Sequence, residues 1–268
     1  MIPIATACSS CAESRVNQRG FSLVELAIAM LIMAVLLGSI IVPLQSQVGI
    51  RKLAETQRTL DQAREALLGY VAANGYFPCP ASSTSNGQEA SPNHATGTCD
   101  ASVTFATALV GFLPAVTLGF TPVDGSGYAL DAWGLTQNRI RYAVANATVN
   151  GVTNPFTKTS GMRNATMSSI LSATTLLYVC RTGTGVTATG CAATTDELTD
   201  NAIAVIWSLG ENAPTGGSAP DEDKNLDDNR VFVLAPYATT GGAIFDDQLT
   251  WIAPPILFNR MVSAGLLP

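Results

Sequence analysis

The sequence predicts an α+β fold in which a long N-terminal helix packs against an antiparallel β-sheet head. An apolar run from Phe21 to Val42 is long enough for a helix of about 33 Å, which spans a hydrocarbon core of about 30 Å. Apolar residues then continue at helical spacing to Gly75. Beyond Tyr76, short apolar runs alternate with connections rich in Gly, Thr and Ser, a pattern typical of strands and loops.

The first half of the predicted helix, residues 21–43, is expected to anchor the chain in a membrane. Arg15 and Arg19 precede it, and positive residues mark the end of a span that stays in the cytoplasm. The bulk of the chain, which follows Pro43, should therefore be translocated.

Glu25 is the one charged residue within this apolar run. A carboxylate inside a membrane costs at least about 2.5 kcal/mol, so it needs a positively charged partner. Cleavage after Gly20 would create a new α-amine on Phe21, four residues before Glu25. Pairing of that amine with Glu25 of a neighbouring helix would relieve the cost only when copies meet. Glu25 is thus a candidate for the residue that sets the register between stacked helices.

The stretch from Arg19 to Leu26, with sequence RGFSLVEL, resembles the prepilin leader and cleavage site of type IV pilins and type II secretion pseudopilins. The resemblance implies cleavage after Gly20 by a prepilin peptidase, N-methylation of Phe21, and assembly through Phe21 and Glu25. A plain single-span anchor with an incidental glutamate is the alternative.

The resemblance divides the chain into three parts. We expect residues 1–20 to be a cleaved leader, residues 21–75 to be the long helix with its anchor at 21–43, and residues 76–268 to be an extracytoplasmic, pilin-like, β-rich head. Because Val16–Gly20 already looks like a complete short leader, translation from Val16 is a further hypothesis.

The second half of the helix should bury one face under the head. Leu60, Leu67 and Val71 carry that apolar stripe, and Asn74-Gly75 provides a helix stop. A stretch at Ala101–Leu118 is ambiguous, and Pro254-Pro255 should begin a short helix that ends at Gly265. The predicted strands of the head are Arg139–Ala145, Leu176–Arg181, Ala202–Leu209 and Arg230–Ala235.

Six cysteines are present, of which Cys8 and Cys11 fall in the expected leader. The other four allow three pairings. We favour the disulfides Cys79–Cys99 and Cys180–Cys191, because each closes a local loop and a translocated compartment permits oxidation. Free buried thiols are the alternative. With one histidine in the chain, a structural zinc site is not expected.

The formal net charge of −6 argues against a nucleic-acid partner, because no basic patch exists to neutralise phosphates. The acidic residues gather in a run that alternates as D-x-D-x-N-x-D, and such spacing lets oxygens converge on a hard cation. Calcium is therefore the one cofactor indicated, and a solvated acidic turn is the alternative. The candidate ligands are Asp221, Asp223, Asn225 and Asp227.

Two patches of the head resemble the major pseudopilin of type II secretion more weakly. Asp131-Ala132-Trp133-Gly134, with Tyr142 downstream, is similar to one segment of that family, with Ala132 in place of a proline. Ser208-Leu209-Gly210-Glu211-Asn212, followed by the acidic run, is similar to a second segment. In that family this second loop holds calcium.

No enzyme signature is found: the sequence lacks a P-loop, a G-x-S-x-G elbow and an H-E-x-x-H pair. His94 lies in a polar loop and is a poor candidate for a base. Asp246 and Asp247 could look like paired carboxylates, and we interpret them as turn or capping residues.

The expected function is therefore that of a non-enzymatic subunit of a type IV pilus or type II secretion pseudopilus. The size of the head favours a minor subunit. The resemblance implies three partners: copies of the chain or other pilins and pseudopilins, a prepilin peptidase, and an inner-membrane assembly platform. It also implies a location in the inner membrane with the head in the periplasm, and later in a periplasmic or cell-surface filament. The alternative is a membrane-tethered periplasmic binding or adhesion domain that forms no filament.

Overall fold

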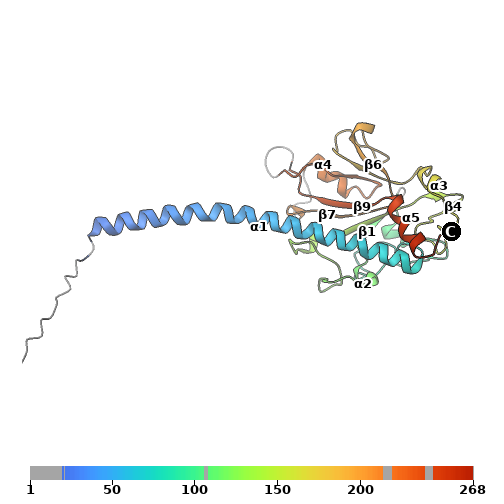
Figure 1. Cartoon of the computed structure of the whole chain (residues 1–268), viewed down its shortest axis with the longest axis horizontal. Helices are drawn as coiled ribbons and strands as arrows, with labels where there is room; N and C mark the ends of the chain where they lie inside the picture. The colour runs from blue at the N-terminus through green and yellow to red at the C-terminus, as the bar shows by residue number, and fades with distance from the viewer. Residues whose placement is uncertain (1–19, 21, 106–107, 214–218, 239–243, 268) are drawn as a thin grey trace, which may run out of the picture. The chain divides into compact units, whose positions relative to one another are not determined.

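The computed structural model describes residues 20, 22–105, 108–213, 219–238 and 244–267, with the side chains of residues 37–46 left out. It divides into two compact units that meet between Gly49 and Ile50. Helix α1, Leu23–Asn74, begins in the first unit and ends in the second (Figure 1). The predicted α+β class is confirmed: a long N-terminal helix precedes a head built on antiparallel sheet.

The part of α1 in the second unit supplies one wall of the hydrophobic core. Leu60, Leu67 and Val71 are at most 1% exposed, which confirms the predicted stripe. They belong to one cluster with residues of the sheet. The helix ends at Asn74, as predicted, because Gly75 adopts a left-handed φ of 81° that favours glycine and its amide closes back onto the carbonyl of Val71.

The main sheet has the strand order β1-β2-β7-β9, and each neighbouring pair is antiparallel. Strands β2 and β7 fall inside predicted runs, whereas β1 and β9 come from stretches that the sequence left ambiguous or assigned to no strand. The strands span Ala108–Phe112 (β1), Arg141–Ala145 (β2), Ala204–Ser208 (β7) and Gln248–Ile252 (β9).

A second sheet has the order β6-β5-β8. Strand β5 is antiparallel to β6 and parallel to β8, so the head is not purely antiparallel. Strands β5 and β8 lie in predicted runs, and β6 was not predicted. These strands span Leu177–Cys180 (β5), Glu197–Ala202 (β6) and Val231–Val233 (β8); a separate hairpin joins Thr148–Val149 (β3) to Val152–Thr153 (β4).

Short helical segments connect the strands. The ambiguous stretch 101–118 holds a 3-10 turn, strand β1 and a short helix in succession. The predicted C-terminal helix is present as α5, Pro254–Ser263, and Arg260 on it forms a 2.6 Å ion pair with Glu65 on α1. The remaining segments are η1 (Ala101–Val103), α2 (Ala115–Leu118), η2 (Thr136–Asn138), α3 (Met167–Leu171), η3 (Thr194–Asp196), α4 (Pro220–Asp223) and η5 (Lys224–Leu226).

Among the described residues the structure contains two disulfides, and they are the two pairs that the sequence favoured. Cys79 is bonded to Cys99 across 20 residues, and Cys180 is bonded to Cys191 across 11 residues. The first fastens the segment after α1, and the second fastens the segment after β5. Cys8 and Cys11 lie outside the described residues.

Candidate functional site

The N-terminal part of α1 is apolar and exposed. Leu23 has 85% of its surface exposed, and the large apolar side chains from Val24 to Leu36 are each more than half exposed. Glu25, also exposed, lies in the first turn of the helix. Gly20 is exposed, whereas Phe21 lies outside the described residues. An apolar surface this continuous marks a site that a protein or a membrane covers.

The predicted calcium ligands occupy a helical segment, α4 followed by η5, in place of an extended loop. Asp221 accepts a hydrogen bond from the backbone amide of Gly183, and Asp227 forms a 3.2 Å ion pair with Lys224. Asp223 is exposed, and Asn225 is buried. The D-x-D-x-N-x-D pattern is therefore split between different neighbours, because residues two apart in a helix point in different directions.

A different set of acids comes together beside this segment. Glu222 on α4 meets Asp246 and Asp247, which precede β9, and one oxygen from each lies within 4.8 Å of the others. All three residues are at most 5% exposed. The backbone amide of Asp246 donates a 3.0 Å hydrogen bond to Oε1 of Glu222, which fixes the spacing of the two acids. We call these three residues the carboxylate cluster.

The loop at Ser208–Asn212, which resembles a loop of the major pseudopilin, forms hydrogen bonds with this cluster. The backbone amides of Glu211 and Asn212 donate hydrogen bonds of 2.7 and 3.0 Å to Oδ2 of Asp246. The side-chain amide of Asn212 donates to Glu222, and that of Asn225 donates to Asp247. The other oxygen of Asp246, Oδ1, is buried and has no hydrogen-bond partner among the described residues.

Burial dominates the electrostatics of the cluster. It raises the pKa of Asp246 to about 6, and the neighbouring charge of Glu222 acts in the same sense. Burial also raises the pKa of Asp247 well above its usual range. Carboxylates held this close repel one another when ionised, so protons or a cation must compensate them. Asp246 and Asp247 are thus more than the turn residues that the sequence indicated.

A second buried acid, Asp131, joins the two patches that resemble the major pseudopilin. Its Oδ2 accepts hydrogen bonds from Oγ of Ser208 at 2.5 Å and from Nδ2 of Asn138 at 2.9 Å. Its Oδ1 accepts from the amides of Trp133 and Gly134. Burial raises the pKa of the Asp131 carboxyl, although these hydrogen bonds act in the opposite sense. Both oxygens of Asp131 are therefore hydrogen-bonded, which gives this acid a structural role.

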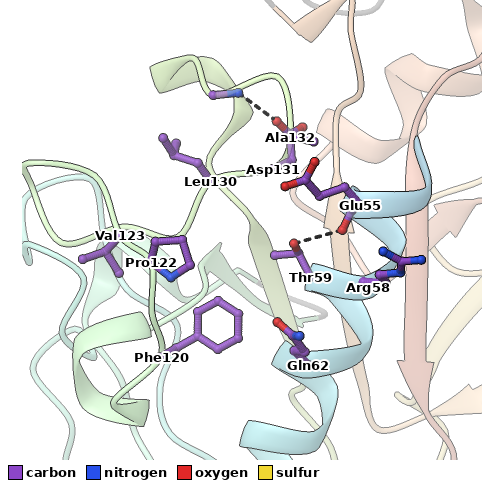
Figure 2. A pocket seen from close by; sticks show the side chains of 11 residues that line it. Glu55, Arg58, Thr59, Gln62, Phe120, Pro122, Val123, Leu130, Asp131 and Ala132 are labelled. Atoms are coloured by element: carbon purple, nitrogen blue, oxygen red, sulfur yellow. Dashed lines mark hydrogen bonds between the residues drawn. The ribbon is translucent and has the colours of Figure 1, made fainter. Parts of the chain in front are cut away.

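A groove of about 410 Å³ lies beside Asp131 in the second unit (Figure 2). Its helical wall carries polar side chains one turn apart on α1, and its opposite wall is mainly apolar. In Figure 2 the side chains of Glu55 and Thr59 lie on the side of α1 that faces the loop carrying Pro122 and Leu130, whereas Arg58 points away from it. The lining residues are Glu55, Arg58, Thr59, Gln62, Phe120, Pro122, Val123, Leu130, Asp131, Ala132 and Gly134. This lining suits a polypeptide or a small amphipathic molecule.

His94 sits in the loop closed by the Cys79–Cys99 disulfide. Its Nδ1 lies 2.7 Å from the carbonyl oxygen of Thr157, and its Nε2 lies 3.0 Å from Oε2 of Glu89. Burial alone would lower the pKa of His94, but Glu89 and the Thr157 carbonyl raise it above its usual value. Two acceptors on one ring favour the doubly protonated form, so His94 is a structural cation and a poor base.

Comparison with known families decides the class of the N-terminal segment. A family model described as the prokaryotic N-terminal methylation motif matches residues 15–41. The chain carries a prepilin-type segment. Such a segment is the cleavage and methylation region of type IV pilins and pseudopilins, so over residues 15–41 the chain is similar to those proteins. No curated protein and no solved structure was found to match the chain.

The prepilin-type segment covers Gly20, Phe21 and Glu25 and the exposed apolar start of α1. It points to a structural protein. In general such a segment implies processing by a prepilin peptidase and assembly with other pilins. The sequence predicts an anchor at residues 21–43; among the residues that the structure describes, no helix is both long and apolar enough to cross a bilayer.

Proposed function

We propose that this chain is a structural subunit of a type IV pilus or type II secretion pseudopilus. A prepilin peptidase cleaves it after Gly20, and it assembles through the N-terminal part of α1. Before assembly the prepilin-type segment anchors it in the inner membrane, with the head on the periplasmic side. The observation that carries this proposal is the match of residues 15–41 to the methylation motif.

The exposed start of α1 gives the proposal its physical basis. A run of apolar side chains from Leu23 to Leu36 that remains uncovered in one copy gains free energy when lipid or other helices bury it. Glu25 is the acid within that run, and the amine of Phe21 after cleavage is the cation that compensates it. Contact between copies satisfies both charges, so the lipid-embedded monomer is driven towards the filament.

Replacement of Glu25 by alanine tests the proposal. We expect the E25A chain to be cleaved after Gly20 as efficiently as the wild type, while the amount recovered in sheared filaments falls steeply. N-terminal sequencing and immunoblotting of the filament fraction measure the two steps separately. Asp61→Ala, which removes an acid from the second half of the same helix, is the matched control and should assemble normally.

The rival function is a tethered periplasmic binding or adhesion domain, and the groove beside α1 favours it. A volume of about 410 Å³ falls in the range of ligand pockets. The same variant separates the two functions, since a tether has no need of Glu25. Normal filament recovery from E25A chains, or the absence of any filament from wild-type cells that cleave the chain, would favour the tether.

The carboxylate cluster is the candidate cation site of the head. We infer that the carboxylate cluster, Glu222 with Asp246 and Asp247, would hold a hard divalent cation such as calcium, with Asn225 adjacent. The fit rests on the buried, unpartnered Oδ1 of Asp246 and on an all-oxygen donor set. A cation there would neutralise the cluster and join α4 to the start of β9. Asp221, Asp223 and Asp227 remain outside this set.

A further inference from the structure

Arg141 on β2 is a half-buried cation that has no counter-ion in contact among the described residues. Its register partners are Phe112 on β1 and Trp207 on β7, and its guanidinium carbon lies 5.6 Å from the centroid of the Phe112 ring. Its Nε is fully buried and has no hydrogen-bond partner. No ion pair reaches it from the part of the chain that the structure describes.

Leaving a guanidinium in this state is costly. A desolvated charge without a hydrogen-bonded partner loses several kcal/mol relative to water. Burial lowers the pKa of Arg141, and the charges of Asp228 and Asp247 offset part of that effect from a distance. Asp247 already receives a hydrogen bond from Asn225. The donor groups of Arg141 are therefore available to another acceptor.

Arg141 lines a small pocket of about 160 Å³ between η1, β1 and the turn that precedes β8. The opposite charge in the lining is Asp228, which forms no ion pair with Arg141. Ser82, Ser83 and Ser102 also line the pocket, and the hydroxyl of Ser102 already donates a 2.7 Å hydrogen bond to Asp100. The pocket thus presents one cation, one anion and several hydroxyls within a space suited to a few heavy atoms.

This lining selects against simple ions. An anion in the pocket would be attracted by the guanidinium of Arg141 and repelled by Asp228. A cation would be attracted by Asp228 and repelled by Arg141. A molecule that carries a carboxylate at one end and an ammonium at the other satisfies both charges at once. The two ends must be close together, because the volume leaves little room between them.

We propose that the Arg141 pocket binds a small zwitterion of the α-amino-acid type. Its carboxylate is held by the fork of the Arg141 guanidinium, which suits two parallel hydrogen bonds, and its ammonium faces Asp228. The serine hydroxyls complete the polar lining. This site is a ligand-binding activity of the head and is independent of filament assembly through α1.

Titration calorimetry on the full mature chain in detergent micelles tests the site, with L-alanine, acetate and methylammonium as probes. Wild-type protein should bind L-alanine about tenfold or more tightly than acetate or methylammonium, since each of those probes carries one of the two charged groups and forgoes the charge-assisted hydrogen bonds of the other. Arg141→Gln should abolish binding of L-alanine. Arg163→Gln, which removes an exposed arginine elsewhere in the head, is the matched control and should bind as the wild type does.

Asp228→Asn provides a second variant that keeps the fold. Asp228 is exposed and has a φ of 50°, a conformation that asparagine tolerates well. This variant should reduce the affinity for L-alanine to that for acetate. The proposal is overturned if wild-type protein binds no L-alanine at millimolar concentration. It is equally overturned if acetate binds as tightly as L-alanine, or if D228N leaves the preference unchanged. None of these results bears on cleavage or assembly.

Discussion

Ser208 and Asp131, 77 residues apart in the sequence, are joined by a 2.5 Å hydrogen bond from Oγ of Ser208 to Oδ2 of Asp131. Ser208 ends β7, and Asp131 lies in the loop before η2. Asn138 strengthens the connection, because its side-chain amide donates both to Asp131 and to the carbonyl oxygen of Gly210. One buried acid therefore holds two loops of the head together.

Ser208→Ala removes the donor and leaves Asp131 buried with one partner fewer. We expect the free energy of unfolding to fall by about 1–3 kcal/mol, the cost of an unsatisfied buried polar group. Chemical denaturation followed by fluorescence measures it. Ser263→Ala is the matched control, because that hydroxyl is exposed and bonds locally to Asn259. A loss no greater in S208A than in S263A would show that the hydrogen bond is dispensable.

The two disulfides should stabilise the fold to slightly different extents, because they close loops of different length. Reduction or paired replacement by serine should lower stability by about 3 kcal/mol for each bond on the chain-entropy model, slightly more for the 20-residue separation than for the 11-residue one. Thermal melts of the C79S/C99S and C180S/C191S variants measure the two effects. Mature protein denatured without reductant should titrate no free thiols. Two free thiols in that assay would exclude one of the bonds.

His94 should make stability depend on pH with a definite sign. Its pKa is raised in the folded state from a usual 6.5, so the folded chain binds the proton more tightly than the unfolded chain. The stabilisation is fully present below about pH 6.5 and is lost as the pH rises through the higher folded value. Replacement by glutamine should therefore destabilise the chain more at pH 5.5 than at pH 8.5.

Stability measured by denaturant at several pH values separates His94 from the acids. Asp246, whose pKa rises from 3.8 to about 6, also binds its proton more tightly when folded, and its contribution changes over that lower window. Both proteins contain Asp246, so its contribution cancels when the free energy of unfolding of H94Q is subtracted from that of the wild type. A difference that stays constant from pH 5.5 to 8.5 would contradict a role for the His94–Glu89 pair.

The sequence predicted those features that depend on local chemistry. The buried stripe at Leu60, Leu67 and Val71 follows from helical spacing, and the helix stop follows from Asn74-Gly75. Strand β1 was ambiguous because Gly111 interrupts its apolar pattern. A side chain there would meet the carbonyl oxygen of Ala81 at 2.5 Å, so a long-range contact selects this glycine.

The acidic site shows where such reasoning fails. The alternation of acids from Asp221 to Asp227 predicted oxygens that converge on one cation. Pro220 instead begins a helical turn, and a proline followed by acids is a recognised helix start. That signal was available in the sequence. The contact of Glu222 with Asp246 was not, because the two residues meet only through tertiary packing of α4 against the segment before β9.

The carboxylate cluster yields a prediction in which one substitution acts in opposite directions with and without metal. Asp246→Asn removes one of three neighbouring buried carboxyl groups, while its amide oxygen can still accept the hydrogen bonds from the backbone amides of Glu211 and Asn212. Without calcium the variant should melt at a higher temperature than the wild type, because repulsion is relieved.

With calcium the order should reverse. A cation that binds the folded state at about 100 times its Kd stabilises that state by about 2.7 kcal/mol, so wild-type protein gains stability and D246N gains little. Melts in calcium and in chelator, with the exposed Asp200→Asn as control, measure both effects. If calcium raises the melting temperature of D246N as much as that of the wild type, the cation binds elsewhere. If it raises neither, protons alone compensate the cluster.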